Sequence, residues 1–454
     1  MSHSLIYFFV VAIMTNNLTA HSPNIAIIGG GLAGLTTGWR LQEKNLNIHI
    51  YEARPRAGGR IFTVYLNDTP CELGGHNIAD GGEATYTKQL AHKLGLTLYE
   101  THLPPIVHNY FDGNTLILEK DLMCHIPHLS AQLIDAARTG KNMRDVLQSL
   151  VTPNTPLYHV LATRLAAYEG APIEQLSTLY ISTLYAILLG GLSAPAPEGV
   201  RNFVTIEGGN SKLTDTLART LPITYNMPLT SIEKTQGGKY LLTFQDHTNA
   251  LYDIVILAIP CSLYKTIHCK DNVIPKERKH LLDSMQCGYT TKILAPLKDG
   301  SHHLKTAIDH NTIAWAQDNI LTLYYIEKPD LLPVEPFFAS KSKMLKTAFE
   351  FTPPHAITHV KDETFCTYNS SITHNWPHDP YAQGSYSYIA PGQEELEYAF
   401  VEEEEEKVKA PFASINRSLY FVGEHTSLGP RGTIEAACES GERIARIITK
   451  RHYE

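Results

Sequence analysis

A glycine-rich segment near the N-terminus has residue types and a spacing suited to binding a diphosphate. Gly29, Gly31 and Gly34 follow the pattern GxGxxG. The first glycine permits a tight turn, the second lets the backbone approach a pyrophosphate, and the third lets a helix and a strand pack closely. Glu52 follows at the distance of a carboxylate that binds ribose hydroxyls. These four residues predict a dinucleotide site.

The sequence around these glycines predicts the strands and the helix that such a site needs. Asn24 to Ile28 is a short apolar run with β-branched residues, typical of a buried parallel strand. Leu35 to Leu41 has helical periodicity, and Leu46 to Tyr51 alternates as a second strand. This order is that of a βαβ unit, in which the helix N-terminus offers free N–H groups and a positive dipole end to phosphates.

The residues that follow Glu52 separate the possible dinucleotides. Gly58-Gly59-Arg60 provides a second close approach of the backbone and a cation for the pyrophosphate. The stretches IAIIGGGLAGL and IYEARPRAGGRIFT closely resemble the flavin-containing amine oxidase family, which includes monoamine oxidases, polyamine oxidases and L-amino-acid oxidases. Segments such as Cys71 to Gly75 and Gly423 to Thr426 extend the resemblance over nearly the whole chain. The resemblance implies FAD as the cofactor.

The resemblance also implies which residues contact FAD. Leu229 is expected to contact the adenine through its backbone, and Glu424 to bond near the ribityl and phosphate portion. Thr433 and Ile434 would present main-chain N–H groups to the pyrimidine edge of the flavin, at a helix N-terminus that stabilises negative charge. The full set of expected cofactor contacts is Gly29, Gly31, Ala33, Gly34, Glu52, Ala53, Arg54, Gly59, Arg60, Gly74, Gly75, His76, Leu229, Trp376, Gly423, Glu424, Thr433 and Ile434.

Lys292 is the expected catalytic residue. It lies in the apolar, strand-like segment Gly288 to Leu294, and the resemblance implies that it sits near flavin N5 and holds a bridging water. Burial there would lower its pKa and suit it to donate to that water. The residues alone leave open a solvent-facing lysine on an edge strand.

The stretch Trp376 to Tyr386 resembles the family segment that flanks the flavin, with two departures nearby. Where mammalian-type monoamine oxidases have a cysteine bonded to the flavin, this chain has Ser385, so FAD is expected to be non-covalent. Tyr386 matches one wall of the aromatic cage that guides the amine to the flavin. The opposite wall falls at Thr433, so the expected cage is incomplete.

Residues after the second glycine pair bear on the substrate. L-amino-acid oxidases commonly have an arginine there for the substrate carboxylate, but this chain has His76-Asn77. Asp80 follows near the place where polyamine oxidases carry an acidic residue for a second ammonium. The alternative for Asp80 is a solvated loop carboxylate.

The order of these segments predicts an α/β and α+β protein with two interleaved domains. Residues 22–85, 199–281 and 370–454 are expected to form a discontinuous Rossmann-like FAD-binding domain. Residues 86–198 and 282–369 are expected to form a substrate-binding domain. Its first part has helical patterning and its second has alternating runs such as Thr322 to Ile326, which indicate helices and a mixed sheet.

Composition excludes several classes of partner and site. The net charge of −8 makes nucleic acid an unexpected partner. The seven cysteines form no CxxC pair and the histidines no ligand-spaced cluster, so neither a metal site nor a disulfide framework is expected. Leu5 to Met14 is too short to span a bilayer but fits the core of a signal peptide covering residues 1–21. If that segment is cleaved, the protein is periplasmic or secreted, and otherwise it is cytoplasmic.

The resulting hypothesis is an FAD-dependent amine oxidase. It would oxidise a primary amine or a polyamine with O2 to an imine, which hydrolyses to an aldehyde, and release H2O2. The alternatives are an L-amino-acid oxidase, a flavin desaturase or protoporphyrinogen oxidase-like enzyme, and a flavoprotein retained as a binding scaffold. The oligomeric state stays open.

Overall fold

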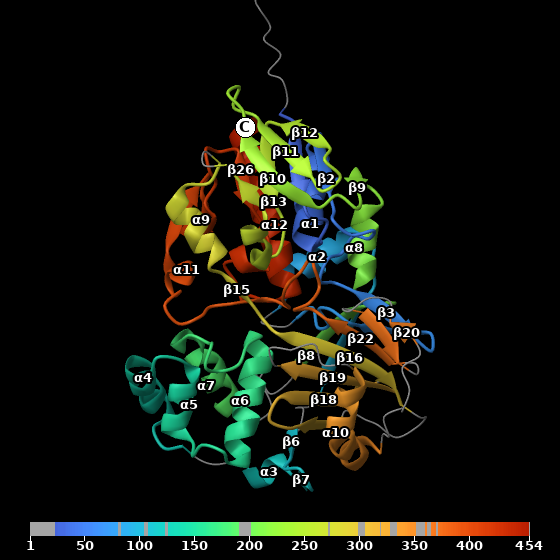
Figure 1. The fold of residues 1–454 in the computed structure, drawn as a ribbon, viewed down its shortest axis with the longest axis vertical. Helices are drawn as coiled ribbons and strands as arrows, with labels where there is room; N and C mark the ends of the chain where they lie inside the picture. Colours follow the sequence, from blue (N-terminus) through green and yellow to red (C-terminus); the bar gives the residue numbers. More distant parts are fainter. Residues whose placement is uncertain are drawn as a thin grey trace, which may run out of the picture.

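The computed structural model describes residues 23–79, 83–103, 108–122, 126–189, 201–270, 273–297, 305–317, 319–326, 334–350, 359–360, 365–368 and 371–453. These residues form two lobes, one above the other in Figure 1. We call the first the Rossmann lobe, because its centre is a parallel sheet, and the second the mixed lobe. The expected signal segment, residues 1–21, and Asp80 lie outside the described residues.

A five-stranded parallel sheet forms the centre of the Rossmann lobe. Its order is β26 (Leu419–Phe421), β13 (Ile254–Leu257), β1 (Ile25–Ile28), β2 (Ile48–Tyr51) and β9 (Ile223–Thr224). The central strand β1 pairs in parallel with β13 on one side and β2 on the other. Since these strands come from distant parts of the chain, the expected discontinuous Rossmann-like fold is confirmed.

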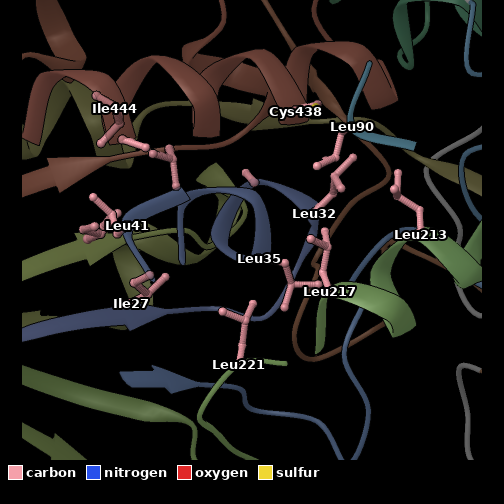
Figure 2. Close-up of a cluster of buried hydrophobic side chains, with 14 of the residues drawn as sticks. Ile27, Leu32, Leu35, Leu41, Leu90, Leu213, Leu217, Leu221, Cys438 and Ile444 are labelled. Carbon is pink, nitrogen blue, oxygen red and sulfur yellow. The ribbon is translucent and has the colours of Figure 1, made fainter. Parts of the chain in front are cut away.

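Helices cover one face of this sheet and bury a large apolar cluster against it. The covering helices are α1 (Leu32–Glu43), α2 (Thr85–Lys93), α8 (Ser211–Ala218) and α12 (Ile434–Tyr453). Figure 2 shows Leu32, Leu35 and Leu41 of α1 among side chains from the sheet and from the other helices. The apolar side chains along α1 are therefore buried, and each Å² of apolar surface removed from water contributes about 25 cal/mol to stability. This packing fixes the position of the N-terminus of α1.

A second layer packs on the opposite face of the parallel sheet. It consists of a four-stranded sheet in the order β12 (Asn249–Tyr252), β11 (Tyr240–Phe244), β10 (Leu229–Lys234) and β14 (His268–Cys269), with η2 (Cys261–Thr266) and α9 (Lys276–Asp283). Phe244, Tyr240 and Leu242 of β11 belong to the same buried cluster as Ala26 and Ile28 of β1.

The mixed lobe joins a helical cluster to a nine-stranded sheet. The cluster contains α4 (Leu129–Thr139), α5 (Met143–Leu150), α6 (Pro156–Glu169), η1 (Thr178–Tyr180) and α7 (Ile181–Leu189). The sheet has the order β20 (His359–Val360), β21 (Phe365–Tyr368), β22 (Ser371–Asn375), β16 (Thr290–Pro296), β19 (Ile320–Ile326), β18 (Thr312–Gln317), β17 (Lys305–Ile308), β6 (His108–Phe111) and β7 (Leu116–Ile117). Helix α10 (Val334–Phe349) packs against the sheet, so the expected mixture of helices and a mixed sheet is confirmed.

Short elements complete the described chain. They are β3 (Thr63–Leu66), β4 (Thr69–Glu72), β5 (Leu98–Leu103), α3 (Glu119–Leu122), β8 (Arg201–Ile206), β15 (Gln286–Cys287), β23 (Ser387–Tyr388), α11 (Glu395–Tyr398), β24 (Phe400–Glu403), β25 (Glu406–Lys409), η3 (Ala410–Phe412) and η4 (Glu424–Thr426).

Strand β22 belongs to the sheet of the mixed lobe. Its residues Ile372 to Asn375 pair with β16, although the boundary expected at residue 370 assigns them to the FAD-binding segments. Within the described ranges, no helix has the length and apolar character needed to cross a bilayer.

Candidate active site

One cavity of about 1960 Å³ is lined by residues of both lobes. Pockets for single small molecules are usually about 300–1,000 Å³, so this one has room for an elongated cofactor and a substrate. It brings together nearly all the site residues expected from the sequence: Gly29, Gly31, Ala33, Glu52, Ala53, Arg54, Gly59, Arg60, Gly74, Gly75, His76, Leu229, Lys292, Trp376, Tyr386, Gly423, Glu424, Thr433 and Ile434. Gly34 does not line it, and Asp80 is outside the described residues.

The first turn of α1 forms a cradle for phosphate at one end of the cavity. Gly31 is the N-cap residue and supplies no side-chain cap, so the first N–H groups of the helix are left for a ligand. A Cβ added to Gly31 would meet no protein atom within 4 Å, because it would project into the cavity. A Cβ added to Gly34 would lie 2.1 Å from the carbonyl oxygen of Gly29. The position of Gly31 therefore leaves space for a ligand, and that of Gly34 is required by the packing of the chain.

Glu52 is held beside this cradle at the end of β2. Its carboxylate accepts hydrogen bonds from the N–H groups of Gly30 at 2.6 Å and Arg54 at 2.8 Å. Burial raises the pKa of Glu52, and these two N–H bonds oppose that rise. The side chain is thus fixed at the cavity wall, where its place fits a ribose contact.

Arg54 is oriented by a network that the sequence did not reveal. Its guanidinium makes two bonds to Asp379, at 2.8 and 2.6 Å, and Asp379 also bonds His374 at 3.0 Å. These partners hold the pKa of Asp379 well below its usual range, although burial opposes them. The fork of Arg54 is therefore locked against the mixed lobe while the residue lines the cavity.

Arg60 and Glu424, which come from opposite ends of the chain, form a partly buried ion pair. Arg60 donates to Glu424 at 2.9 Å and to the carbonyl oxygen of Ser385 at 2.9 Å. The remaining partners of Glu424 are the N–H and hydroxyl of Ser387 and the N–H of Gly432. Although burial would raise the pKa of Glu424, Arg60 and these bonds lower it to about 2. Glu424 thus fixes the surrounding loops and the direction of Arg60.

The N-terminus of α12 reaches the cavity on the side of Tyr386. The Thr433 hydroxyl caps the helix by accepting the N–H of Ala436 at 3.0 Å. Thr433 and Ile434 line the cavity at the positive end of the helix dipole. This arrangement suits a cofactor that becomes more negative when reduced.

Lys292 lies in the middle of the large sheet and faces the cavity. Strand β16 pairs with β19 on one side and β22 on the other, so the edge-strand alternative for this lysine is wrong. The residue is 3% exposed, and its ammonium donates to the carbonyl oxygen of Gly74 at 3.3 Å. Its burial in the cavity wall suits a role beside the cofactor.

The ring of Trp315 lies near the ammonium of Lys292. The Trp315 ring centroid lies 5.9 Å from Lys292 Nζ, and His76 stacks on Trp315 with ring centroids 6.5 Å apart. Burial, and then the charge of Lys292, lower the pKa of His76 to about 3, so its imidazole is neutral. Trp376 lines the same region and donates its indole N–H to Leu73 O at 3.1 Å.

Tyr386 forms a further aromatic wall with Tyr324. The Tyr324 hydroxyl donates to that of Tyr386 at 3.1 Å, and Tyr386 donates to the carbonyl oxygen of Ala167. Gly170 and Gly432, at φ 85° and 71°, pack against the Tyr386 ring, where an added Cβ would come within 2.7 and 2.8 Å. Although Thr433 provides no aromatic wall opposite Tyr386, Tyr324 and Trp315 provide further aromatic side chains at the cavity. The alternation in β18, where Ile313, Trp315 and Gln317 line the cavity, is the signal that could have identified Trp315.

Glu169 is a cavity residue that sequence reasoning missed. It ends α6, which begins at the Thr155 cap with Pro156 in its first turn and ends at Gly170 in a left-handed conformation. Its carboxylate accepts a hydrogen bond from the Thr183 hydroxyl at 2.5 Å. Enclosure by protein raises its pKa to about 7. No motif surrounds this residue, so only the packing of α6 and α7 places it here.

Arg431 is a second missed residue. It immediately precedes Gly432, and its side chain is 9% exposed. Glu397 and the carbonyl oxygen of Leu396 accept bonds from the guanidinium, but Nη1 has no hydrogen-bond partner among the described residues. Its charge opposes the rise in the pKa of Glu169, and both residues line the cavity.

The residues present fit a flavin cofactor. The uncapped turn of α1 and the open space at Gly31 fit a diphosphate, and the buried Ser385 hydroxyl at the cavity wall has no partner among the described residues. Lys292, Trp376 and Tyr386 stand at the far end, where a flat ring system would meet a substrate.

Comparisons with known proteins agree with this arrangement. The family described as flavin containing amine oxidoreductase matches residues 126–299 and 345–449, and an NAD(P)-binding Rossmann-like domain matches residues 27–94. A lysine-specific histone demethylase 1 homolog 2 of Arabidopsis thaliana is 23% identical over 94% of this chain and 58% of its own length. Polyamine oxidase 4 of Oryza sativa subsp. japonica is 22% identical over 95% of this chain and 90% of its own.

A solved structure shows the same fold. Cyclohexylamine oxidase from Brevibacterium oxydans IH-35A superposes with a TM-score of 0.71 at 16% identity, over 95% of this chain and 99% of that one. The family match covers more than half of the present chain. The chain therefore belongs to the flavin containing amine oxidoreductases, a family of flavin-dependent enzymes that act on amines.

Proposed function

We propose that this protein is an FAD-dependent amine oxidase that acts on a primary amine or a polyamine. It would use O2, give an imine that hydrolyses to an aldehyde, and release H2O2. The observation that carries the proposal is the position of Lys292, buried within aromatic walls in the same cavity as the phosphate cradle of α1. One end of the cavity thus fits a dinucleotide and the other an organic amine.

FAD would be bound without a covalent bond. The cradle at Gly31, the carboxylate of Glu52 and the cation of Arg60 suit the adenosine diphosphate portion. Ser385 stands at the position of the cysteine that bonds to the flavin in monoamine oxidases. Its hydroxyl cannot form the thioether by which that cysteine holds the flavin. Acid precipitation should therefore release the flavin into the supernatant, and flavin that stays in the pellet would contradict non-covalent binding.

The chemistry supplied by a bound flavin would be the acceptance of a hydride equivalent from the carbon beside nitrogen. The chain's residues orient the amine and exclude bulk water. Tyr386, Tyr324 and Trp315 line the cavity as connected aromatic side chains and would flank an amine placed there. Lys292, whose Nζ donates to the carbonyl oxygen of Gly74 at 3.3 Å, would also hold a water at that nitrogen.

Glu169 favours a diamine or a polyamine over a simple monoamine. A carboxylate with a pKa of about 7 in a mainly apolar cavity is ionised above neutral pH and would pair with a second ammonium. The name polyamine oxidase borne by one relative is consistent with this substrate class. Asp80, the acidic residue expected from the sequence, stays part of the proposal only as a second candidate for that ammonium.

An amino acid is the second candidate substrate, and Arg431 is the observation that favours it. Its buried Nη1 has no partner among the described residues and lies on a side chain that lines the cavity. A substrate carboxylate could accept from that nitrogen. The ion pair with Glu397 already neutralises much of the charge of Arg431, so this candidate is the weaker one.

The test is a peroxide-release assay with putrescine, spermidine, tyramine and L-leucine. We expect putrescine or spermidine to have the highest kcat/KM. Glu169→Gln should raise the KM for these two amines by about tenfold, which corresponds to the loss of ~1.4 kcal/mol. The KM for tyramine should not rise. Glu174→Gln, at an exposed carboxylate paired with Arg144, is the matched control and should change neither. If the protein prefers L-leucine and Arg431→Gln removes that preference, the substrate is an amino acid.

Absence of peroxide with every amine, in a protein that holds flavin, would favour a desaturase-like enzyme or a binding scaffold.

Export through residues 1–21 is also part of the proposal. Sequencing the N-terminus of the protein purified from its source organism would show whether that segment is removed.

A further inference from the structure

Two cysteines that are distant in the sequence meet beside the active-site cavity. Cys261 and Cys287 are free thiols, 1% and 6% exposed, and their Sγ atoms lie 3.0 Å apart. Neither residue belongs to a CxxC pair, so the spacing of the cysteines gave no sign of this contact. The contact is produced by the fold: Cys261 opens η2 after β13, and Cys287 ends β15.

The two thiols have unequal surroundings. The contact between them lowers the pKa of Cys287 and raises that of Cys261, which makes Cys287 the better nucleophile. The Arg60 guanidinium also favours a thiolate at Cys287, while the Glu424 carboxylate and burial oppose it. A nucleophilic thiol with a second thiol in contact is the arrangement that forms a disulfide through a sulfenic acid.

The pair lies directly behind the wall of the cavity. Pro260, which precedes Cys261, lines the cavity, and so does Ser385, whose N–H donates to the carbonyl oxygen of Gly288 at 2.9 Å. Cys287 pairs with Ser387 between β15 and β23, and Figure 1 shows β15 at the junction of the two lobes. The two thiols are therefore next to residues that line the cavity.

We propose that Cys261 and Cys287 form an oxidation site that closes to a disulfide with hydrogen peroxide as the oxidant. The Cys287 thiolate attacks one peroxide oxygen, the O–O bond breaks, and the departing hydroxide takes a proton to become water. Cys261 then attacks the sulfur of the resulting Cys287 sulfenic acid, and its thiol proton leaves with the hydroxyl group as a second water. The two sulfurs lose two electrons in all, and one peroxide is reduced to two waters. The peroxide supply in the working enzyme rests on the proposed function.

The disulfide would join η2 of the Rossmann lobe to the strand that leads into β16 and Lys292. Because a cross-link restricts the unfolded chain, the oxidised protein should have a higher Tm than the reduced one. The Tm should be insensitive to peroxide once either cysteine is replaced.

The experiment treats the reduced holoenzyme with added H2O2 in the absence of amine. Remaining thiols are then alkylated, the protein is unfolded and digested, and the linked peptides are mapped. Titratable thiols should fall from the seven of the sequence to five, with one Cys261–Cys287 link. Cys287→Ser and Cys261→Ser should each abolish the link, and Cys269→Ser, at a half-buried cysteine on β14, should retain it.

A second arm replaces added peroxide by amine turnover, with and without catalase. A link that forms with added peroxide but not during turnover supports the cysteine pair and contradicts peroxide release by the enzyme. Seven surviving thiols after added peroxide, a link between other cysteines, or a sulfinic acid on Cys287 with Cys261 untouched would overturn the proposal. Mapping the wild-type protein decides this even if a serine variant fails to fold.

Discussion

The two ends of the active-site cavity are built in different ways. At the phosphate end, backbone groups form the surface, and glycines sit where a side chain would collide with the chain or fill the ligand space. At the substrate end, side chains form the surface: Lys292 from β16, Trp315 from β18, Tyr324 from β19 and Glu169 from α6. These come from elements that only the packing of the mixed lobe brings together.

The difference determines how each end tolerates change. A backbone cradle needs particular residues at fixed spacing, because it depends on close approach and on free N–H groups. A cavity of side chains can change one wall without losing the others, as the combination of Thr433 with Tyr386 and Tyr324 shows. We therefore expect substitutions at the phosphate end to remove the cofactor or the fold, and substitutions at the substrate end to alter rate and preference.

The largest effect is expected for Gly34→Val. A Cβ there would lie 2.1 Å from Gly29 O, so neither β1 nor α1 could keep its place, and soluble, yellow protein should be lost. Gly31→Val is the matched variant, because its side chain meets no protein atom within 4 Å at Cβ. It should fold, with an unchanged far-ultraviolet circular dichroism spectrum, but bind FAD on the order of 100-fold more weakly, as overpacking of about 3 kcal/mol implies. Tight flavin binding by Gly31→Val would show that the phosphate lies elsewhere.

Lys292→Met should slow flavin reduction or reoxidation by about 100-fold or more, the usual scale for removing a proton-transfer group, while flavin remains bound. Stopped-flow measurement of each half-reaction checks this. Lys341→Met is the control, because Lys341 is also a buried lysine but pairs with Asp309 at 2.6 Å in the mixed lobe. It should lower the Tm without changing the rate per bound flavin. Equal rates in Lys292→Met and wild type would remove the role assigned to Lys292.

The pH dependence of diamine binding should follow Glu169. Its pKa of about 7 means that the carboxylate is protonated below neutral pH and charged above it, so the KM for putrescine should rise as pH falls through about 7.

The effect of pH on the stability of the protein has the opposite direction. A raised pKa in the folded state stabilises the protein fully below about 4.5, and this contribution is lost as pH rises to about 7. In Glu169→Gln both dependences should disappear; a KM profile that is unchanged in this variant would place the second ammonium elsewhere.

The smallest effect is expected for Thr433→Val. The substitution keeps the size of the side chain but removes the cap that accepts the N–H of Ala436, which should cost about 1 kcal/mol of unfolding free energy. Thr433→Ser retains the hydroxyl and should retain the stability. Chemical denaturation of the three proteins compares them, and equal stability of Thr433→Val and wild type would show that the cap contributes little.

The residues expected at the phosphate end could be chosen from the sequence because their physical requirements are local. Gly29, Gly31 and Gly34 lie within one turn and one helix start, and Glu52 follows at the end of the next strand. Lys292, Trp376 and Tyr386 came from resemblance, and the cavity brings them together. Glu169 and Arg431 could not be found in this way. A glutamate at a helix end and an arginine in a loop are ordinary surface residues until the packing of α6, α7 and α11 encloses them.

The central claim is that this cavity holds FAD beside an amine, and anaerobic mixing with putrescine tests it most directly. We expect the visible absorption band of the bound flavin to bleach, and to bleach far more slowly in Lys292→Met although that variant holds the same flavin. A flavin band that putrescine, spermidine, tyramine and L-leucine all leave unchanged in the wild-type protein would contradict the account.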